Sequence, residues 1–394
     1  MKNLYTASRI IVGLVLIFSG FVKGIDPLGS NYKFIDYFTA FGIEFLNPIA
    51  LYLGVLLSTF EFVLGAMLIF HVKPRASSWI LLIFMGFFTL LTFYLALTNP
   101  VQDCGCFGDA IVMSNWETFW KNVVIMVFVV IVFINRNKFQ SPYSNNWQWG
   151  ITGISALIIL GFSFYCYHHL PVFDFRPYNV GANIPDKMEI PDDAPKPEYK
   201  TILKYKKDGE IREFKMDSLP DSTWQWVETK NIKIKEGYQP PIENFTISTL
   251  EGEDITDIVL NQDKFTFMFI AYDLGEADKS EMDQINRLAE FCNNANNCSF
   301  IGLTASLEEE IESFKNNTGA SFSFYQADEI TLKTIIRANP GLMLIKKGTI
   351  LDKWHNNDLP STRVFKEDFL NNPEYKGKKE NENKSKTDQE ELKS

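Results

Sequence analysis

Long apolar runs separated by short polar segments fill the first 170 residues of this 394-residue chain. Runs of about 18 or more apolar residues can cross a bilayer, and shorter runs can do so when flanking lysines and arginines extend toward the headgroups. Five runs are therefore predicted to cross the membrane: Ile10–Val22, Ile49–Phe70, Trp79–Leu97, Val123–Ile134 and Gly150–Tyr165.

Cationic residues distinguish the two ends of this membrane half. They precede the first span and lie in the connections between spans two and three and between spans four and five: Lys2, Lys73, Arg75, Arg136 and Lys138. Because cytoplasmic loops carry the excess of lysine and arginine, these ends are predicted to be cytoplasmic. The loop 98–118 and everything after residue 170 are then predicted to lie outside. The alternative for residues 1–24 is a cleaved signal peptide, although no clear small-x-small cleavage site follows.

The chain after residue 170 has a different composition. Residues 1–170 carry 9 Lys+Arg against 7 Asp+Glu, whereas residues 171–394 carry 29 against 41. This acidic balance argues against a nucleic-acid-binding protein. The proline-rich stretch 190–197 indicates an extended linker, and two strand-like runs around Lys207-Asp208-Gly209 predict a hairpin. We expect a small β-containing unit over residues 171–240.

Residues 241–370 alternate strand-like and helix-like patterns. The buried-strand runs Phe265–Tyr272 and Ser299–Leu303 are separated by Ser280–Cys292, whose apolar residues follow the helical period. This order, with Asn339-Pro340-Gly341 before a further apolar strand, resembles the thioredoxin fold. The resemblance implies a cis X-Pro bond at that point.

The same resemblance places the dithiol of that fold, Cys-x-x-Cys, at Leu274 and Ala277. Neither residue can act as a nucleophile. We therefore expect this domain to bind a partner, or to dock on the membrane half, without exchanging disulfides at that position. The tail 375–394 is rich in Lys, Glu and Asn and is predicted to be disordered.

The candidate chemistry lies in Asp103-Cys104-Gly105-Cys106-Phe107-Gly108-Asp109, within the outward loop. Glycine permits the tight backbone that a Cys-x-Cys bridge requires, and strained, exposed disulfides are the exchange-active ones. We predict that Cys104 and Cys106 form such a disulfide. The flanking aspartates would raise the pKa of both thiols, unless Lys23 and Lys121 lie close enough to offset them. The alternatives are a static disulfide and a shared metal. A tetrahedral metal needs about four ligands, and we expect no metal site.

Three other residues are candidates. Glu61 lies near the middle of the second span, where an ionisable group is costly and is a functional candidate by default. We predict that it transfers protons during the redox reaction, the alternative being a structural hydrogen bond. Cys292 and Cys298 are predicted to form a structural disulfide. Cys166, at the outer end of the fifth span, is either a resolving thiol or a packing residue.

Three short motifs in the membrane half are shared with a known family. They are Phe18–Gly24 followed by Asp26-Pro27, Glu61-x-x-x-Gly65, and Asp103–Gly108. On these motifs residues 1–140 resemble the DoxX/MauE family of four-helix membrane proteins. The last motif points to the MauE branch, which is associated with methylamine utilisation and with disulfides in a periplasmic partner. The resemblance implies a helical bundle and thiol redox work, with a quinone as the candidate electron carrier.

These observations predict a thiol–disulfide redox protein of the bacterial inner membrane, with its C-terminal domain in the periplasm. Cys104, Cys106 and Glu61 would carry the reaction, exchanging disulfides with a periplasmic protein and passing electrons to or from a carrier such as quinone. The rival prediction is a non-enzymatic assembly or docking factor. The predicted fold class is a membrane all-α bundle of four helices plus a fifth transmembrane helix, followed by a soluble α/β thioredoxin-like domain. The predicted divisions are 1–140, 147–170, 171–240, 241–370 and the tail 375–394.

Overall fold

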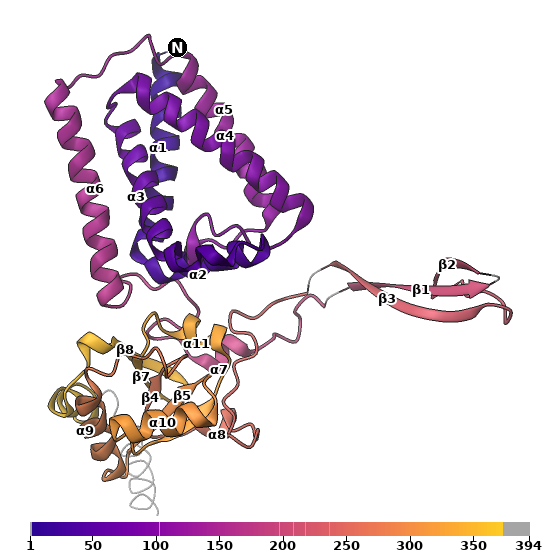
Figure 1. Ribbon diagram of the computed structural model, residues 1–394, viewed down its shortest axis with the longest axis vertical. Helices are drawn as coiled ribbons and strands as arrows, with labels where there is room; N and C mark the ends of the chain where they lie inside the picture. Colours follow the sequence, from indigo (N-terminus) through magenta and orange to yellow (C-terminus); the bar gives the residue numbers. More distant parts are fainter. Residues whose placement is uncertain are drawn as a thin grey trace, which may run out of the picture.

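The computed structural model describes residues 2–101, 103–196, 198–207, 209–216, 218–235 and 237–372. A bundle of long helices lies above a compact α/β domain, and a narrow β-sheet projects from one side between them (Figure 1). The predicted fold class, a membrane all-α bundle followed by a soluble α/β domain, is confirmed. The predicted tail 375–394 lies outside the described residues.

Four of the five membrane helices extend beyond the apolar runs that predicted them, and the second matches its run to within one residue at each end. Among the described residues, five helices are long and apolar enough to cross a membrane. They are α1 Lys2–Ile25, α3 Ala50–Ile69, α4 Pro74–Thr98, α5 Asn115–Ile134 and α6 Asn145–His168. The added residues include polar, capped ends: at the start of α5, Ser114 and Glu117 form a capping box that satisfies backbone N–H groups.

The two ends of the bundle differ as the cation pattern predicted. The N-terminus, the α3–α4 connection and the α5–α6 connection lie at one end (Figure 1). The α4–α5 loop with its two cysteines lies at the other end, facing the soluble domain. The cationic connections that predicted the orientation and the loop with the cysteines are thus at opposite ends of the bundle.

A helix that no apolar run predicts, α2 Pro27–Ala40, lies across the end of the bundle nearest the soluble domain (Figure 1). The Asp26 side chain caps it by accepting a hydrogen bond from the Gly29 N–H, and Pro27 occupies a first-turn position where its missing N–H costs nothing. A short 3-10 segment, η1 Glu44–Ile49, then leads into α3.

Helices α1 and α3 approach each other closely through small residues. A Cβ atom added at Gly20 would lie 2.5 Å from the backbone nitrogen of Phe62 and 2.6 Å from the carbonyl oxygen of Ser58. Small residues allow such close backbone contact between membrane helices. Helix α6 joins this pair, because the Ser163 hydroxyl donates to the Gly24 carbonyl at 2.8 Å.

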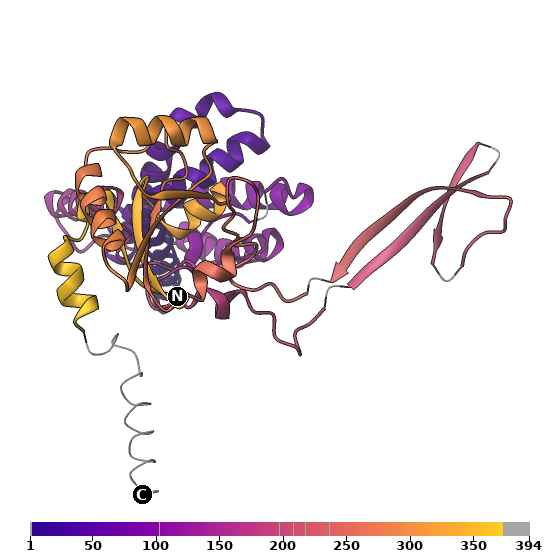
Figure 2. The same cartoon turned by 90° about the horizontal axis from the view of Figure 1, so that it is seen from below.

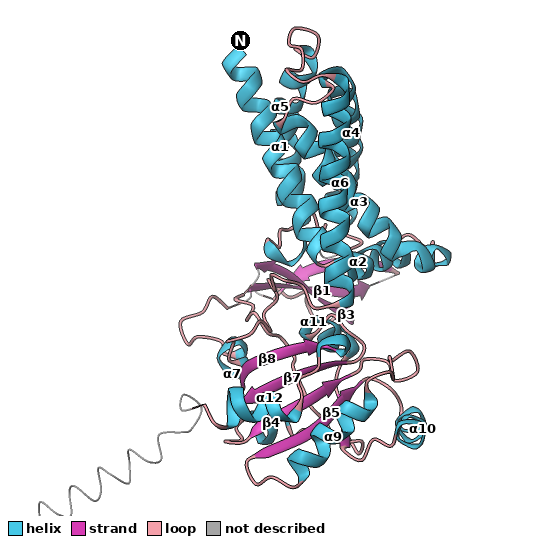
Figure 3. Ribbon diagram, turned by 90° about the vertical axis from the view of Figure 1, so that its left-hand side faces the viewer, coloured by secondary structure: helices cyan, strands magenta, loops and turns pink. Residues whose placement is uncertain are grey.

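The soluble domain is built on a mixed sheet with the strand order β6-β5-β4-β7-β8 (Figure 3). Its strands are β4 Phe265–Ile270, β5 Cys298–Thr304, β6 Ser323–Gln326, β7 Gly341–Lys346 and β8 Thr349–His355. Strands β4, β5 and β6 are parallel, whereas β7 is antiparallel to both β4 and β8. The Asn339–Pro340 bond before β7 is cis, as predicted.

Helices cover both faces of this sheet. The alternation of side chains along a strand explains why: Phe267 and Phe269 enter one core, while Met268 and Ile270 enter the other. The first face packs against α9 Met282–Asn293, α10 Glu308–Thr318 and α12 Thr362–Phe365. The second face packs against α7 Ile184–Met188, α8 Thr256–Leu260 and α11 Glu329–Ile335. The short segments η3 Asn356–Asp358 and η4 Lys366–Leu370 complete the C-terminal region.

The soluble domain begins earlier than the predicted boundary at residue 241. Tyr178 and Ile184 are buried in the same core as Met343. The Ile184 N–H also donates to the carbonyl of Gly348 at the β7–β8 turn. The proline-rich stretch that indicated a linker therefore leads out of this domain into an insertion, and the chain later returns to the domain.

The insertion is the sheet of β1 Glu198–Lys207, β2 Glu210–Lys215 and β3 Gln225–Lys235, with strand order β2-β1-β3. The predicted hairpin corresponds to β1 and β2, which pair antiparallel. The third strand was not predicted. Seen from below, this twisted sheet extends well away from both domains (Figure 2), and we call it the β-arm.

Candidate functional site

The cysteines of the α4–α5 loop face each other. The sulfur atoms of Cys104 and Cys106 lie 3.1 Å apart, at hydrogen-bond distance, and both residues are free thiols. The predicted disulfide between them is not formed in this structure, and exchange between dithiol and disulfide stays a prediction. Gly105 has φ +64, and a Cβ there would also lie 2.8 Å from the Lys33 side chain, so this turn requires glycine. We call residues 103–109 the thiol loop.

Side chains from two helices hold the backbone of the thiol loop. The Ser19 hydroxyl of α1 donates to the carbonyl of Cys106 at 2.7 Å, and the Tyr37 hydroxyl of α2 donates to the carbonyl of Cys104 at 2.9 Å. Both bonds fix the cysteine main chain. Helices α1 and α2 therefore hold the main chain of the thiol loop in place.

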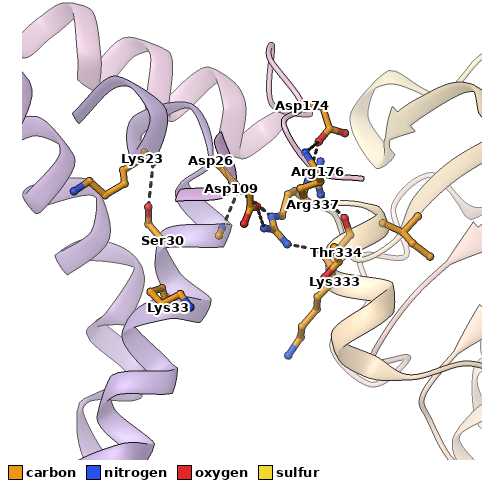
Figure 4. Close-up of polar contacts among 12 residues, drawn as sticks. Lys23, Asp26, Ser30, Lys33, Asp109, Asp174, Arg176, Lys333, Thr334 and Arg337 are labelled. Carbon is orange, nitrogen blue, oxygen red and sulfur yellow. Dashed lines mark hydrogen bonds and ion pairs between the residues drawn. The ribbon is translucent and has the colours of Figure 1, made fainter. Parts of the chain in front are cut away.

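Each aspartate of the thiol loop is paired with a cation. The Lys33 ammonium of α2 lies 3.0 Å from Asp103. The Arg337 guanidinium of the soluble domain lies 3.0 Å from Asp109, a pair that Figure 4 shows. The condition under which lysines offset these carboxylates is met for Cys106, because Lys121 and Lys23 lower its pKa. The charges of both aspartates are compensated locally.

The two thiols have different acidities. The hydrogen bond from Cys104 lowers the pKa of Cys106 to about 6, against the effect of burial, and the positive charges of Lys121 and Lys23 act in the same direction. Donating that hydrogen bond and being buried raise the pKa of Cys104. At neutral pH the pair therefore holds one thiolate, which is the nucleophilic form, and one thiol.

Glu61 lies on α3 and pairs with Lys23 near the end of α1, at 2.6 Å. Both side chains are buried. Because α1 and α3 lie close together, the Lys23 ammonium can reach the Glu61 carboxylate. Of the two predictions for Glu61, the structure contains the structural hydrogen bond, which Lys23 donates; proton transfer stays a prediction.

A cavity of about 380 Å³ opens between the membrane helices beside the thiol loop. Its wall includes Cys106, Glu61 and Lys121 together with apolar side chains such as Phe84 and Phe88. Small-molecule sites have this volume and this combination of an apolar lining with few polar groups. The thiol pair, the buried carboxylate and the apolar space thus share one site.

The other predicted cysteines lie elsewhere. Cys292 and Cys298 are joined in a disulfide at the C-terminal end of α9 and the start of β5, inside the core of the soluble domain. Cys166 is buried near the end of α6 and is a free thiol. Leu274 and Ala277 follow β4 and are 1% and 7% exposed, which makes them core residues.

Three contacting residues were missed by sequence reasoning. Lys33 and Tyr37 are four residues apart on α2, the spacing that places two side chains on one helix face. That spacing is a signal that could have identified them, had α2 been predicted. Arg337 is 228 positions from Asp109, and only the fold brings the two together.

Comparison with known families agrees with this division of the chain. Residues 1–135 match the family model described as methylamine utilisation protein MauE. These residues form a MauE-family domain. Residues 199–236, which contain most of the β-arm, match a model described as a domain of unknown function, DUF8463.

Comparison with curated proteins gives no match. Among solved structures, the chain is similar to a solution structure from Bacteroides thetaiotaomicron, described as a candidate protein disulfide isomerase. The identity is 19%, the similarity covers 29% of this chain and 76% of that chain, and the TM-score is 0.25.

Proposed function

We propose that this protein is a membrane thiol–disulfide oxidoreductase in which Cys104 and Cys106 exchange disulfides with a periplasmic protein. The observation that carries the proposal is the position of the pair: sulfur atoms 3.1 Å apart, in the wall of an apolar cavity among the membrane helices. We place the thiol loop on the outward face of the bacterial inner membrane, where disulfides persist.

The exchange chemistry follows from the unequal acidities of the two thiols. The Cys106 thiolate attacks one sulfur of a partner disulfide, that S–S bond breaks, and the released partner thiolate takes up a proton. Cys104 then loses its proton and attacks Cys106 in the mixed disulfide, which releases the second partner thiol and leaves Cys104–Cys106 oxidised. Two electrons pass to the partner, and the reverse sequence oxidises a partner dithiol.

The cavity fits a lipid-soluble carrier that would restore the pair. Its lining is largely apolar and aromatic, and the residues that line it include the charged Glu61 and Lys121 as well as the thiols. A quinone bound there would exchange two electrons and two protons with the cysteine pair. The role of the chain's own residues is to hold the carrier's ring by apolar contact and to hold a proton at the Glu61 carboxylate, beside Lys23.

The second candidate function is a non-enzymatic assembly factor related to methylamine utilisation. The observation that favours it is the soluble domain, where Leu274 and Ala277 fill the positions of the expected dithiol and an arginine docks the domain on the membrane half. In this function the soluble domain would bind a client protein, and the cysteines would be dispensable.

Trapping of mixed disulfides in cells separates the two functions. In Cys104→Ser the Cys106 thiolate can attack but cannot be resolved, so a mixed disulfide with a partner should accumulate and be released by reductant. Cys166→Ser is the matched control and should accumulate none. If the double variant Cys104→Ala, Cys106→Ala retains full activity in cells, the assembly-factor function is the better account.

A further inference from the structure

Arg337 is the central residue of the contact between the soluble domain and the membrane half. It follows α11 and precedes the cis Asn339–Pro340 bond, and it is 6% exposed. Its Nε lies 3.0 Å from both carboxylate oxygens of Asp26, and its Nη2 lies 3.0 Å from Asp109 (Figure 4). One buried guanidinium thus bridges two carboxylates of the membrane half.

Both carboxylates belong to segments that position the thiols. Asp109 lies three residues after Cys106, in the thiol loop itself. Asp26 caps α2, the helix whose Lys33 and Tyr37 hold Asp103 and the Cys104 carbonyl. Arg337 therefore ties the soluble domain to the thiol loop directly and through α2.

A second attachment runs through residues 171–176, which connect α6 to the soluble domain and which we call the strap. Within the strap, Arg176 pairs with Asp174 at 2.7 Å and donates to the carbonyl of Thr334 at 3.0 Å (Figure 4). Lys353 of β8 pairs with Asp174 and donates to the carbonyl of Ile335. The strap and the soluble domain are thus joined, and strap residues also line the cavity.

The thiol pair is largely covered in this arrangement. Cys104 is only 8% exposed, and Cys106 is also covered in part. A partner protein must bring its sulfur atom in line with the Cys106 sulfur, and beside the loop lie the Arg337–Asp109 contact and the strap residues of the cavity wall. Exchange with a protein therefore requires these contacts to open.

We propose that Arg337 is a positioning residue that seats the soluble domain over the thiol loop, so that a protein partner reaches Cys104 and Cys106 only when the Arg337–Asp26–Asp109 cluster separates. This inference rests on the proposed exchange function for its biological role. The seated domain then acts as a lid that excludes proteins and leaves the cavity side of the pair open to a lipid-soluble carrier.

The test measures labelling of the full-length protein, in detergent, by a small maleimide and by a maleimide linked to polyethylene glycol. Peptide mass analysis identifies which thiol reacts. Removing one partner of a buried ion pair leaves uncompensated charge, so Arg337→Met should favour the open form. We expect labelling of the thiol loop by the bulky reagent to accelerate about tenfold or more, with a much smaller change for the small reagent.

Three further variants sharpen the test. Arg337→Lys keeps the charge and should restore slow labelling in part. The double variant Asp26→Asn, Asp109→Asn removes the acceptors from the membrane half, so it tests the cluster even if Arg337→Met impairs folding of the soluble domain. Lys347→Gln removes an exposed ion pair with Asp263 from the same domain and should change nothing.

Two results would overturn the proposal. One is equal bulky-reagent labelling of the wild type and of both cluster variants, and the other is an equal acceleration in Lys347→Gln. Labelling needs no turnover, so its outcome is independent of the exchange function. If no mixed disulfides form in cells, the proposed exchange function is wrong. The labelling result alone then decides whether the soluble domain acts as a lid.

Discussion

Each half of this protein carries a cysteine pair, and the two pairs are in opposite environments. Cys104 and Cys106 are thiols in a loop held by α1, α2 and the soluble domain, beside cations and a cavity. Cys292 and Cys298 are bonded to each other inside an apolar core. The comparison teaches that reactivity follows the surroundings of a pair, because charge and access set thiolate formation.

The soluble domain extends the contrast. Leu274 and Ala277, in the loop after β4, belong to the core of the domain, so this end of the domain is packed with apolar side chains. The nearby α11–β7 segment supplies Arg337 to the membrane half. We propose that the soluble domain contributes by docking on the membrane half.

The largest effect should come from deleting each pair in turn. Cys104→Ala, Cys106→Ala should abolish disulfide exchange in cells, because no thiolate remains in the thiol loop. Cys292→Ser, Cys298→Ser should retain exchange and lower the free energy of unfolding of the soluble domain by about 2 kcal/mol, the value for a short closed loop. Exchange assays and thermal unfolding measure these two effects. If exchange is lost only in Cys292→Ser, Cys298→Ser, the reactive pair is the one in the soluble domain, which contradicts the comparison.

Breaking the buried ion pair should have the next largest effect. Glu61→Gln leaves the Lys23 charge uncompensated and should lower the free energy of unfolding by about 3–5 kcal/mol. Thermal unfolding in detergent measures it. The apolar double variant Lys23→Met, Glu61→Leu should recover most of this loss, whereas Lys347→Gln at an exposed pair should cost less than about 1 kcal/mol. A Glu61→Gln protein as stable as wild type would show that the pair is not a structural element.

The pH dependence of alkylation should separate the two thiols. A lowered pKa means that Cys106 is deprotonated above about pH 6, so its reaction with iodoacetamide should rise through that pH and level off near neutrality. The raised pKa of Cys104 should keep it unreactive over the same range. Peptide-resolved mass analysis provides the measurement. A midpoint for Cys106 near the ordinary value of about 8.5 would contradict the assigned electrostatics.

Much of the fold follows from local sequence pattern. The apolar runs and the cation bias predicted the membrane helices and their relative orientation, because both reflect the solvent around each segment. Helix α2 was not predicted because its sequence has no strong helical period of apolar residues. Only Pro27 and Phe38 are buried, so most of its positions do not need to be apolar. The boundary at residue 241 was misplaced because the β-arm interrupts the soluble domain.

The candidate site was predicted less completely. Cys104, Cys106 and Glu61 stand out by residue type alone, since thiols one glycine apart and a carboxylate within an apolar run are unusual. Lys33 and Arg337 are ordinary surface residue types in sequence. Their roles depend on contacts 70 and 228 positions away, which local patterns do not encode.

Redox titration of the full-length protein tests the central claim most directly. Both cysteine pairs are equilibrated in buffers of known potential, quenched by alkylation and read by peptide mass. The account predicts that Cys104–Cys106 titrates above about −300 mV and that Cys292–Cys298 titrates below it, with the inert structural disulfides. A Cys104–Cys106 potential below about −300 mV would place that pair with the structural ones and contradict the account.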